Sequence, residues 1–349
     1  MSINQPKWKV AEYSRSQIIN AGKAVRRAGL LDDEITESTK TIIDNWRAAH
    51  AFPLHVIYIH LRNMKNKRND VIVAERLKRL DSIIEKLKRQ PNMSLWAMQD
   101  LGGCRVIVPT VNEVYAFAEK YENSRKRHIR KKIDDYIKSP KQSGYRSLHV
   151  IYEYKSDRTS AYNKNMLIEI QFRTHLQHLW ATAVETMGIF TKEAIKSGQG
   201  SEEVKRFFVL VSALFALEEG QAIVPGVVAD KDKIIQEMDF LNTRYNYLSF
   251  LSGIRVATDN LQSIRAKNKS GYCILILNYS KGRLLCKYFK ASQFDEANNI
   301  YNSIERTNIE DKIDAVLVRT SSFGELRSAY PNYFSDITEF VARVKHFLK

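Results

Sequence analysis

Three apolar runs of strand length constrain the fold of this chain most strongly. They are "CRVIVPT" (104–110), "YRSLHVIYEY" (145–154) and "NMLIEIQFRT" (165–174). In the third run apolar and polar residues alternate from 168 to 173, which is the two-residue period of a strand with one buried face. Because helix-like stretches precede and follow these runs, the pattern predicts an α+β protein with a mixed β-sheet flanked by helices.

The polar face of the third run carries Glu169, Gln171 and Arg173 at two-residue spacing. A face that simply meets solvent explains such an alternation, because half-buried strands are commonly polar on one side. A wall of a catalytic cleft explains it equally well. The strand alone leaves both interpretations open.

The pattern of expected helices and strands in the rest of the chain predicts two units joined by a connector. Residues 11–90 are mainly helical in pattern, including an amphipathic helix expected over 71–91 that Pro91 ends. A hairpin turning at 280–282, a helix, the strand "DAVLVRT" and a last helix form a β-β-α-β-α unit. The predicted divisions are 1–228, a helical connector 229–268, and 269–349.

Charge and composition narrow the partners. The chain has 349 residues, and Lys and Arg exceed Asp and Glu by 16, which favours a polyanionic partner such as nucleic acid or a phosphate-rich substrate. The most apolar window, "FFVLVSALFAL" (207–217), is too short to span a bilayer, so we expect a cytoplasmic protein with no membrane contact. Three cysteines without CxxC spacing argue against a disulfide framework and against a zinc site.

Residues suited to phosphoryl transfer lie near the strand-like runs. Asp100 before a Gly-Gly turn and Glu169 in the third run offer carboxylates for Mg²⁺, which prefers few protein oxygens and the phosphates of its substrate. Four more candidates follow the glycine at 144: Tyr145, Arg146, Ser147 and His149. Four basic side chains that could neutralise phosphate charge lie on the helix expected over 71–91: Arg76, Lys78, Lys86 and Arg89.

Each of these residues has a simpler interpretation. The four cations suit a solvated helix face, and Tyr145 suits an apolar core. His175 and His178, at i, i+3 spacing, are interpreted as packing residues and not as metal ligands, since no third ligand is near in the sequence.

The ordered set "RLKRLDSIIEKL", "DLGGCRVIV", "SPKQSGYRSLHV" and "IEIQFRTHLQHLWATAVE" resembles the synthetase domain of the RelA/SpoT alarmone family over about residues 36–190. That resemblance implies an ATP-dependent pyrophosphokinase, which moves pyrophosphate from ATP to a ribose 3′-hydroxyl and releases AMP. It implies that Asp100 holds Mg²⁺, that Glu169 binds Mg²⁺ or acts as the base, and that Gln171 supports Glu169. The implied ATP residues are Arg76, Arg105, Lys78 and Arg173. The implied acceptor residues are Tyr145, His149 and Lys141.

Residues 269–349 resemble the small C-terminal domain of the CapRel-type fused toxin–antitoxin branch, a zinc-finger-like domain without its metal ligands. In that branch a Tyr-x-x-Tyr element occupies the ATP site, and "AYPNYF" supplies Tyr330 and Tyr333. The resemblance implies autoinhibition, transfer to the 3′-CCA end of tRNA, a block of translation, and release by a phage capsid protein in antiviral defence.

Basic clusters bear on the choice between a tRNA acceptor and free GDP or GTP. A track of phosphates rewards several cations, so three clusters around one cleft favour tRNA. An alarmone synthetase and a catalytically inactive RNA-binding protein are the alternatives, and surface solubility explains any one cluster. The cations assigned to tRNA are Lys23, Arg26, Arg27, Arg125, Lys126, Arg127, Arg130, Lys131 and Lys132, with a further cluster at Arg62, Lys65, Lys67 and Arg68.

Overall fold

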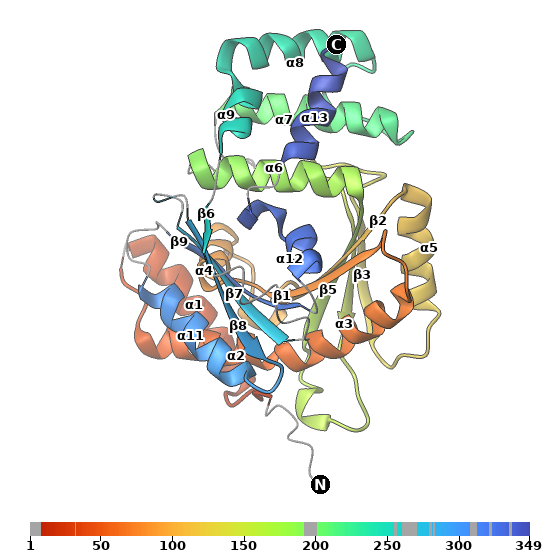
Figure 1. Cartoon of the computed structure of the whole chain (residues 1–349). Coiled ribbons are helices and arrows are strands. Elements are labelled where there is room, and N and C mark those ends of the chain that lie inside the picture. The colour runs from red at the N-terminus through yellow and green to blue at the C-terminus, as the bar shows by residue number, and fades with distance from the viewer. Residues whose placement is uncertain are drawn as a thin grey trace.

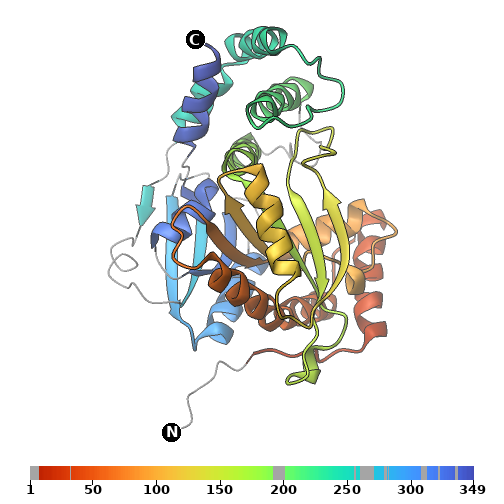
Figure 2. The same ribbon diagram turned by 90° about the vertical axis from the view of Figure 1, so that its right-hand side faces the viewer.

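A single mixed β-sheet runs through the molecule, with helices on both faces and a further group of helices above its upper end (Figures 1 and 2). The computed structural model describes residues 8–31, 33–191, 201–254, 257–259, 271–278, 281, 283–307, 313–320, 323–334 and 337–349. The predicted α+β class with a mixed sheet is confirmed within these residues.

Within the described residues the sheet has nine strands, in the order β3-β4-β5-β2-β1-β9-β7-β8-β6. Five come from the first half of the chain: β1 (Ile72–Leu77), β2 (Gly102–Val108), β3 (Ile129–Asp135), β4 (Leu148–Glu153) and β5 (Leu167–Thr174). Four come from the C-terminal part: β6 (Ala257–Asp259), β7 (Gly271–Asn278), β8 (Arg283–Lys290) and β9 (Ile313–Thr320). Strand β9 pairs with β1 at Arg76 and Val318, so the C-terminal strands continue the same sheet.

Strand register aligns the candidate residues in one band across four strands. Gly103 lies beside Glu169 on the parallel pair β2 and β5, and it lies opposite Arg76 on the antiparallel pair β1 and β2. His149 on β4 lies opposite Gln171 on β5. Because alternate side chains share a face, this register places the polar face of β5 beside β1 and β2.

Helices cover the two faces and form the upper group. Before β5 these are α1 (Arg15–Leu31), α2 (Glu37–Ala49), α3 (Ala51–Lys65), α4 (Leu80–Arg89) and α5 (Val111–Glu122). After β5 come α6 (His175–Thr191), α7 (Glu202–Glu218), α8 (Lys231–Tyr245), α9 (Tyr247–Gly253), α11 (Phe294–Thr307), α12 (Phe323–Ala329) and α13 (Thr338–Phe347). Short 3₁₀ turns are η1 (Leu95–Ala97), η2 (Ser160–Tyr162) and η4 (Pro331–Phe334).

The cores cross the predicted boundaries between units. One apolar cluster joins residues of α3, β2 and α5 to Tyr272, Phe294 and Tyr301 of the C-terminal part. A second cluster packs Phe340 and Val344 of α13 against α6, α7 and α8. Residues of the third segment, 269–349, thus contribute to apolar clusters shared with the first two segments. The divisions at 228 and 268 remain predictions.

The helix expected over 71–91 is wrong in its first half. Ile72–Leu77 is the strand β1, and only Leu80–Arg89 is helical. Arg76 therefore lies on a strand and Lys78 in the link after it, while Lys86 and Arg89 lie on α4 as expected. The β-branched run at 71–73 favours a strand, and pairing with β2 and β9 on both sides overrides the helical spacing.

The other strands follow the apolar runs, with two additions, β3 and β6. The hairpin of β7 and β8 is confirmed, with Lys281 in its turn, and residues 280 and 282 lie outside the described residues. Strand β3 overlaps the second half of the basic cluster 125–132 and ends at Asp135, where the sequence suggested no strand. Strand β6 lies within 229–268, so the prediction of a helical connector is wrong at Ala257–Asp259. No helix in the described part of the chain combines the length and apolar character needed to cross a bilayer.

Candidate active site

A cavity of about 440 Å³ opens on the face of the sheet formed by β1, β2 and β5. Its walls bring together candidates that are far apart in the sequence. They are Ala74, Arg76, Lys78, Asp100, Gly103, Cys104, Arg105, Glu169, Gln171 and Tyr330.

Asp100 sits in the turn before β2, and both of its oxygens are held by lysines. Lys78 Nζ donates to one carboxylate oxygen and Lys86 Nζ to the other, each at 2.9 Å. Burial works to raise the pKa of Asp100, but the two ammonium groups hold it well below its usual range. The carboxylate is therefore ionised at neutral pH, beside two cations suited to phosphate.

The polar face of β5 forms a chain of hydrogen bonds that ends at Glu169. Gln171 Nε2 donates to Glu169 Oε2 at 2.6 Å, and Arg173 Nη2 donates to Gln171 Oε1 at 2.5 Å. Arg173 is fully buried, so it supports the wall and does not line the cavity. The face of β5 thus meets the cavity through Glu169 and Gln171.

His149 links Glu169 to Tyr145. Its Nδ1 lies 2.9 Å from Glu169 Oε1, and its Nε2 lies 2.8 Å from the Tyr145 hydroxyl oxygen. Burial lowers the pKa of a histidine, but Tyr145 and Glu169 together raise the pKa of His149 to about 9. The ring is therefore protonated at neutral pH and donates from both nitrogens. Burial works to raise the pKa of Glu169, but the charge and hydrogen bond of His149 lower it.

Tyr145 follows a turn that requires glycine. Gly144 has φ +89°, and a Cβ there would lie 3.0 Å from Ser212 Cβ and 3.1 Å from the Trp180 ring. Tyr145 itself is buried, with Lys141 Nζ 5.2 Å from the centre of its ring. A base could stack on this ring only after the ring is uncovered.

Arg76 and Arg105 approach the cavity from β1 and β2. Burial works to lower the pKa of both guanidinium groups. Glu185 on α6 counters it and raises the pKa of Arg76, while the nearby Arg173 helps to lower the pKa of Arg105 to about 10. Sequence reasoning missed Glu185 as a site residue, although it ends the quoted stretch "ATAVE". Two arginines balanced by one carboxylate form a cationic pocket for an anionic ligand.

The segment 323–334, comprising α12 and η4, lies between the sheet and α6 (Figure 1), and its Tyr330 lines the cavity. The Tyr330 hydroxyl donates to the backbone oxygen of Glu75 at 2.8 Å, and Arg105 Nη1 donates to the backbone oxygen of Ala329 at 3.2 Å. His178 Nε2 lies 3.2 Å from the backbone oxygen of Ser328, consistent with the packing role expected of it. Tyr330 and Tyr333 are both buried.

The basic cluster 125–132 is largely neutralised by neighbouring carboxylates. Five of its six cations have an ion-pair partner within 4 Å, and these partners include Glu122 and Glu153. Most of these residues lie on or beside β3, at one edge of the sheet. Charged side chains on an edge strand also prevent pairing with other chains. Lys23 and Arg27 are exposed on α1, while Arg26 donates to the backbone oxygen of Met93.

Among the described residues that line the cavity, the carboxylates that could bind a metal ion are those of Asp100 and Glu169. Among the described residues, no group of three or more His, Cys, Asp or Glu could hold a metal ion. Two carboxylates facing a cationic pocket fit Mg²⁺, which commonly takes one or two protein carboxylates together with substrate phosphates. Cys273 and Cys286 are buried free thiols on neighbouring strands, and the hydrogen bond between them and burial raise the pKa of Cys273.

Comparison with protein families places a known region over this site. Residues 75–193 match the family described as "Region found in RelA / SpoT proteins". This stretch contains the second half of β1 together with β2, β5 and α6, and therefore most of the cavity wall.

Named relatives match the same part of the chain. GTP pyrophosphokinase YjbM of Bacillus subtilis is 36% identical over 112 residues, which are 32% of this chain and 52% of the relative. GTP pyrophosphokinase YwaC of the same organism is 26% identical over 161 residues, 42% of this chain and 76% of the relative. The chain thus spans about half the length of YjbM.

Solved structures with similar folds cover about half of the chain. Small alarmone synthetase 1 of B. subtilis bound to its product pppGpp has 26% identity and a TM-score of 0.43, covering 49% of this chain and 89% of that one. A GTP pyrophosphokinase family protein from Streptococcus pneumoniae has 28% identity and a TM-score of 0.42, covering 49% and 86%.

Proposed function

We propose that the cavity transfers pyrophosphate from ATP to the 3′-hydroxyl of a guanine nucleotide, GDP or GTP. The observation that carries this proposal is the meeting of Asp100 and Glu169 with Arg76, Arg105 and Lys78 around one cavity. The match of residues 75–193 to a RelA/SpoT region supports it, as do relatives named GTP pyrophosphokinases.

In this reaction the 3′-oxygen attacks the β-phosphorus of ATP, the bond from that phosphorus to the bridging oxygen of the α-phosphate breaks, and AMP leaves. Glu169 takes the proton of the attacking hydroxyl or holds Mg²⁺, and Gln171 fixes its carboxylate by the 2.6 Å hydrogen bond. Bound Mg²⁺ would offset phosphate charge at Asp100 and Glu169. Lys78 and Lys86 then turn from Asp100 towards the phosphates, where their charge stabilises the transition state.

The acceptor side is assigned to Tyr145, His149 and Lys141. Tyr145 is proposed to stack on the guanine, and the protonated His149 to orient Glu169 towards the 3′-hydroxyl. Since Tyr145 is buried in this structure, acceptor binding requires that its ring be uncovered.

A guanine nucleotide is favoured over tRNA because the basic cluster 125–132 is largely satisfied by carboxylates of the chain itself. A phosphate track would have to compete with Glu122 and Glu153 for these cations. The tRNA acceptor remains the second candidate, supported by the net charge of +16. A capsid trigger and a role in antiviral defence rest on the resemblance of the C-terminal unit alone.

We also propose that the segment 323–334 holds the enzyme closed. Tyr330 lines the cavity together with Arg76 and Arg105, which we assign to ATP, and Arg105 Nη1 donates to the backbone oxygen of Ala329. The hydrogen bond from the Tyr330 hydroxyl to the backbone of Glu75 holds the ring in this position, and tethering gives it a high effective concentration. Tyr333, buried in the next turn, is assigned to the same contact.

The test incubates radiolabelled ATP with GDP, GTP or tRNA and follows the label. The wild-type protein and the Tyr330→Ala variant are compared, with Glu169→Gln in the Tyr330→Ala background as the inactive control. We expect the label on GDP or GTP, with a higher rate for Tyr330→Ala. Label on tRNA alone would show that the acceptor is tRNA and not GDP or GTP. No transfer by either protein to any acceptor would overturn the pyrophosphokinase proposal.

A further inference from the structure

Residues 78–80, from the end of β1 to the first residue of α4, contact the C-terminal part of the chain directly at 79 and 80, and through Arg47 of α2 at 78. Arg47 Nη1 donates to the backbone oxygen of Lys78 at 3.3 Å, and Arg47 is itself bound by Glu305 of α11. Arg79 forms an ion pair with Asp314 of β9. The backbone N–H of Leu80 donates to Glu305 Oε1 at 2.9 Å. We call residues 78–80 the junction.

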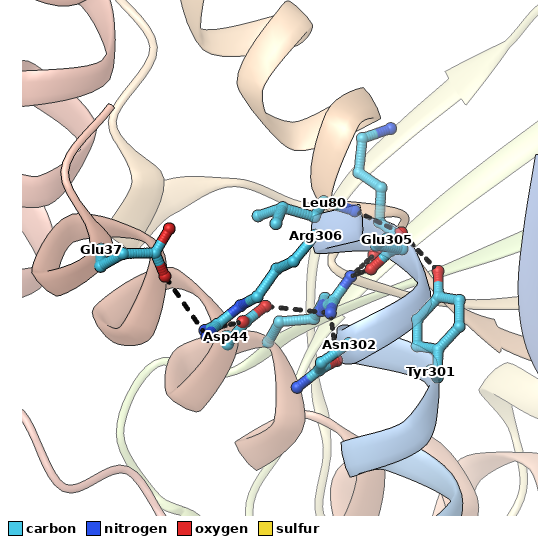
Figure 3. A network of polar contacts seen from close by, with 9 residues as sticks. Glu37, Asp44, Leu80, Tyr301, Asn302, Glu305 and Arg306 are labelled. Carbon is cyan, nitrogen blue, oxygen red and sulfur yellow. Dashed lines mark hydrogen bonds and ion pairs between the residues drawn. The ribbon is translucent and has the colours of Figure 1, made fainter. Parts of the chain in front are cut away.

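Glu305 is the centre of a buried polar network (Figure 3). One of its oxygens accepts from Arg47 at 2.6 Å, and the other accepts from the Tyr301 hydroxyl at 2.7 Å as well as from Leu80. Arg47 is fully buried and also donates to Asn302 at 2.6 Å. A buried charge is costly unless it is paired and hydrogen-bonded, so each partner here depends on the others.

The contact of Glu305 with Leu80 is a helix cap supplied from a distant part of the chain. Helix α4 begins at Leu80, its first N–H groups need acceptors, and Arg79 at the N-cap position makes no side-chain capping bond. A carboxylate at a helix N-terminus satisfies an N–H and interacts favourably with the helix dipole. Glu305 therefore fixes where α4 starts and how it is directed.

This cap bears on the active site because the junction connects the two lysines that hold Asp100. Lys78 belongs to the junction and Lys86 lies on α4, and each donates to one oxygen of Asp100 at 2.9 Å. A shift of the start of α4 would move Lys86 relative to Lys78. The position of both ammonium groups thus depends on a residue of the C-terminal part.

We propose that Glu305 is a positioning residue for the Lys78–Asp100–Lys86 group, and that α11 and β9 stay docked in the active form of the enzyme. The C-terminal part is then not a unit that leaves as a whole. Opening of the site is confined to the segment 323–334, which follows β9. This inference rests on the proposed function for its kinetic consequences, but its structural content is independent of the acceptor.

The first test measures hydrogen exchange of the Leu80 amide and of the first turn of α4 in the full chain. Glu305→Ala should speed exchange there by about 2- to 30-fold, the effect of losing a cap. Ser303→Ala is the matched control, because Ser303 is exposed on the same helix and contacts Thr307 through its backbone oxygen. Glu305→Gln, which keeps an oxygen for Leu80, should restore most of the protection.

The second test measures kinetics in the Tyr330→Ala background. Glu305→Ala should raise KM for ATP and the Mg²⁺ concentration for half-maximal rate, each about tenfold, with Ser303→Ala unchanged and Glu305→Gln nearer to wild type. Unchanged exchange at Leu80 in folded Glu305→Ala, or an equal effect of Ser303→Ala, would overturn the inference. Absence of transfer in all variants, with exchange changed as expected, would instead refute the proposed function.

Discussion

The closed state predicts a graded response of ATP binding to changes at Tyr330. Its hydroxyl donates to the backbone of Glu75 at 2.8 Å, and its ring is 3% exposed within an apolar cluster. Tyr330→Phe removes the hydrogen bond, about 1 kcal/mol. Tyr330→Ala removes the ring as well, for a total of about 4 kcal/mol.

These energies convert directly into populations of open protein. Since about 1.4 kcal/mol is a factor of ten, Tyr330→Phe should raise the open fraction about fivefold and Tyr330→Ala up to about 10³-fold. The apparent Kd for ATP should fall by the same factors until the open form predominates. Calorimetric titration with ATP or a non-hydrolysable analogue, in the presence of Mg²⁺, measures this ratio.

Ser328→Ala is the matched control for these titrations. Ser328 lies on α12 with an exposed side chain, and only its backbone oxygen contacts His178. Its removal should leave ATP binding unchanged. If Tyr330→Ala is folded by circular dichroism and binds ATP no more tightly than wild type, the ring does not block the site, and the closed-state proposal fails.

Three further predictions concern the site and the sheet. Asp100→Asn and Glu169→Gln, each in the Tyr330→Ala background, should lower the transfer rate by about 10²-fold or more without loss of folding; near-normal rates would remove that carboxylate from the mechanism. His149 has its pKa raised from 6.5 to about 9, so its contribution to stability, about 3 kcal/mol, is complete below pH 6.5 and is lost as the pH rises through 9. Urea unfolding between pH 6 and 10 should show this slope, and His149→Gln should flatten it; an equal slope in both would exclude His149. A chain ending at 254 exposes the β1 edge and should aggregate in size-exclusion chromatography; a folded monomer would show that the C-terminal strands are dispensable.

The sequence predicted three of the four strands that carry catalytic candidates, because each contains an apolar run. Strands β4 and β5 fall within two of the runs first noted, and β2 begins at Gly102, two residues before "CRVIVPT". The fourth strand, β1, was predicted to be helical. Strand β3 could not be predicted in this way, because its five residues from Ile129 to Ile133 are exposed and it is defined by pairing with β4. Its charge pattern indicated a binding surface, whereas its position at the sheet edge gives the charges another role.

The sequence predicted the residues of the candidate site better than it predicted the secondary-structure elements that carry them. Asp100, Glu169, Arg76 and Arg105 line one cavity, although Arg76 was expected on a helix. Helical spacing from 77 to 87 continues across the start of α4, so local periodicity gave no boundary there. That boundary is set by Glu305, which lies 225 residues from Leu80 and carries no sequence signal.

The pairing of β1 with β9 also has a consequence for synthesis of the protein. Arg76 meets its partner Val318 only after roughly 240 more residues have been made, which takes about 12–50 s at about 5–20 residues per second. The segment 323–334, proposed to be inhibitory, begins almost immediately after β9. If the sheet must be complete before the site can work, catalytic competence and its restraint leave the ribosome nearly together. A nascent chain would then have almost no interval in which it is active and unrestrained.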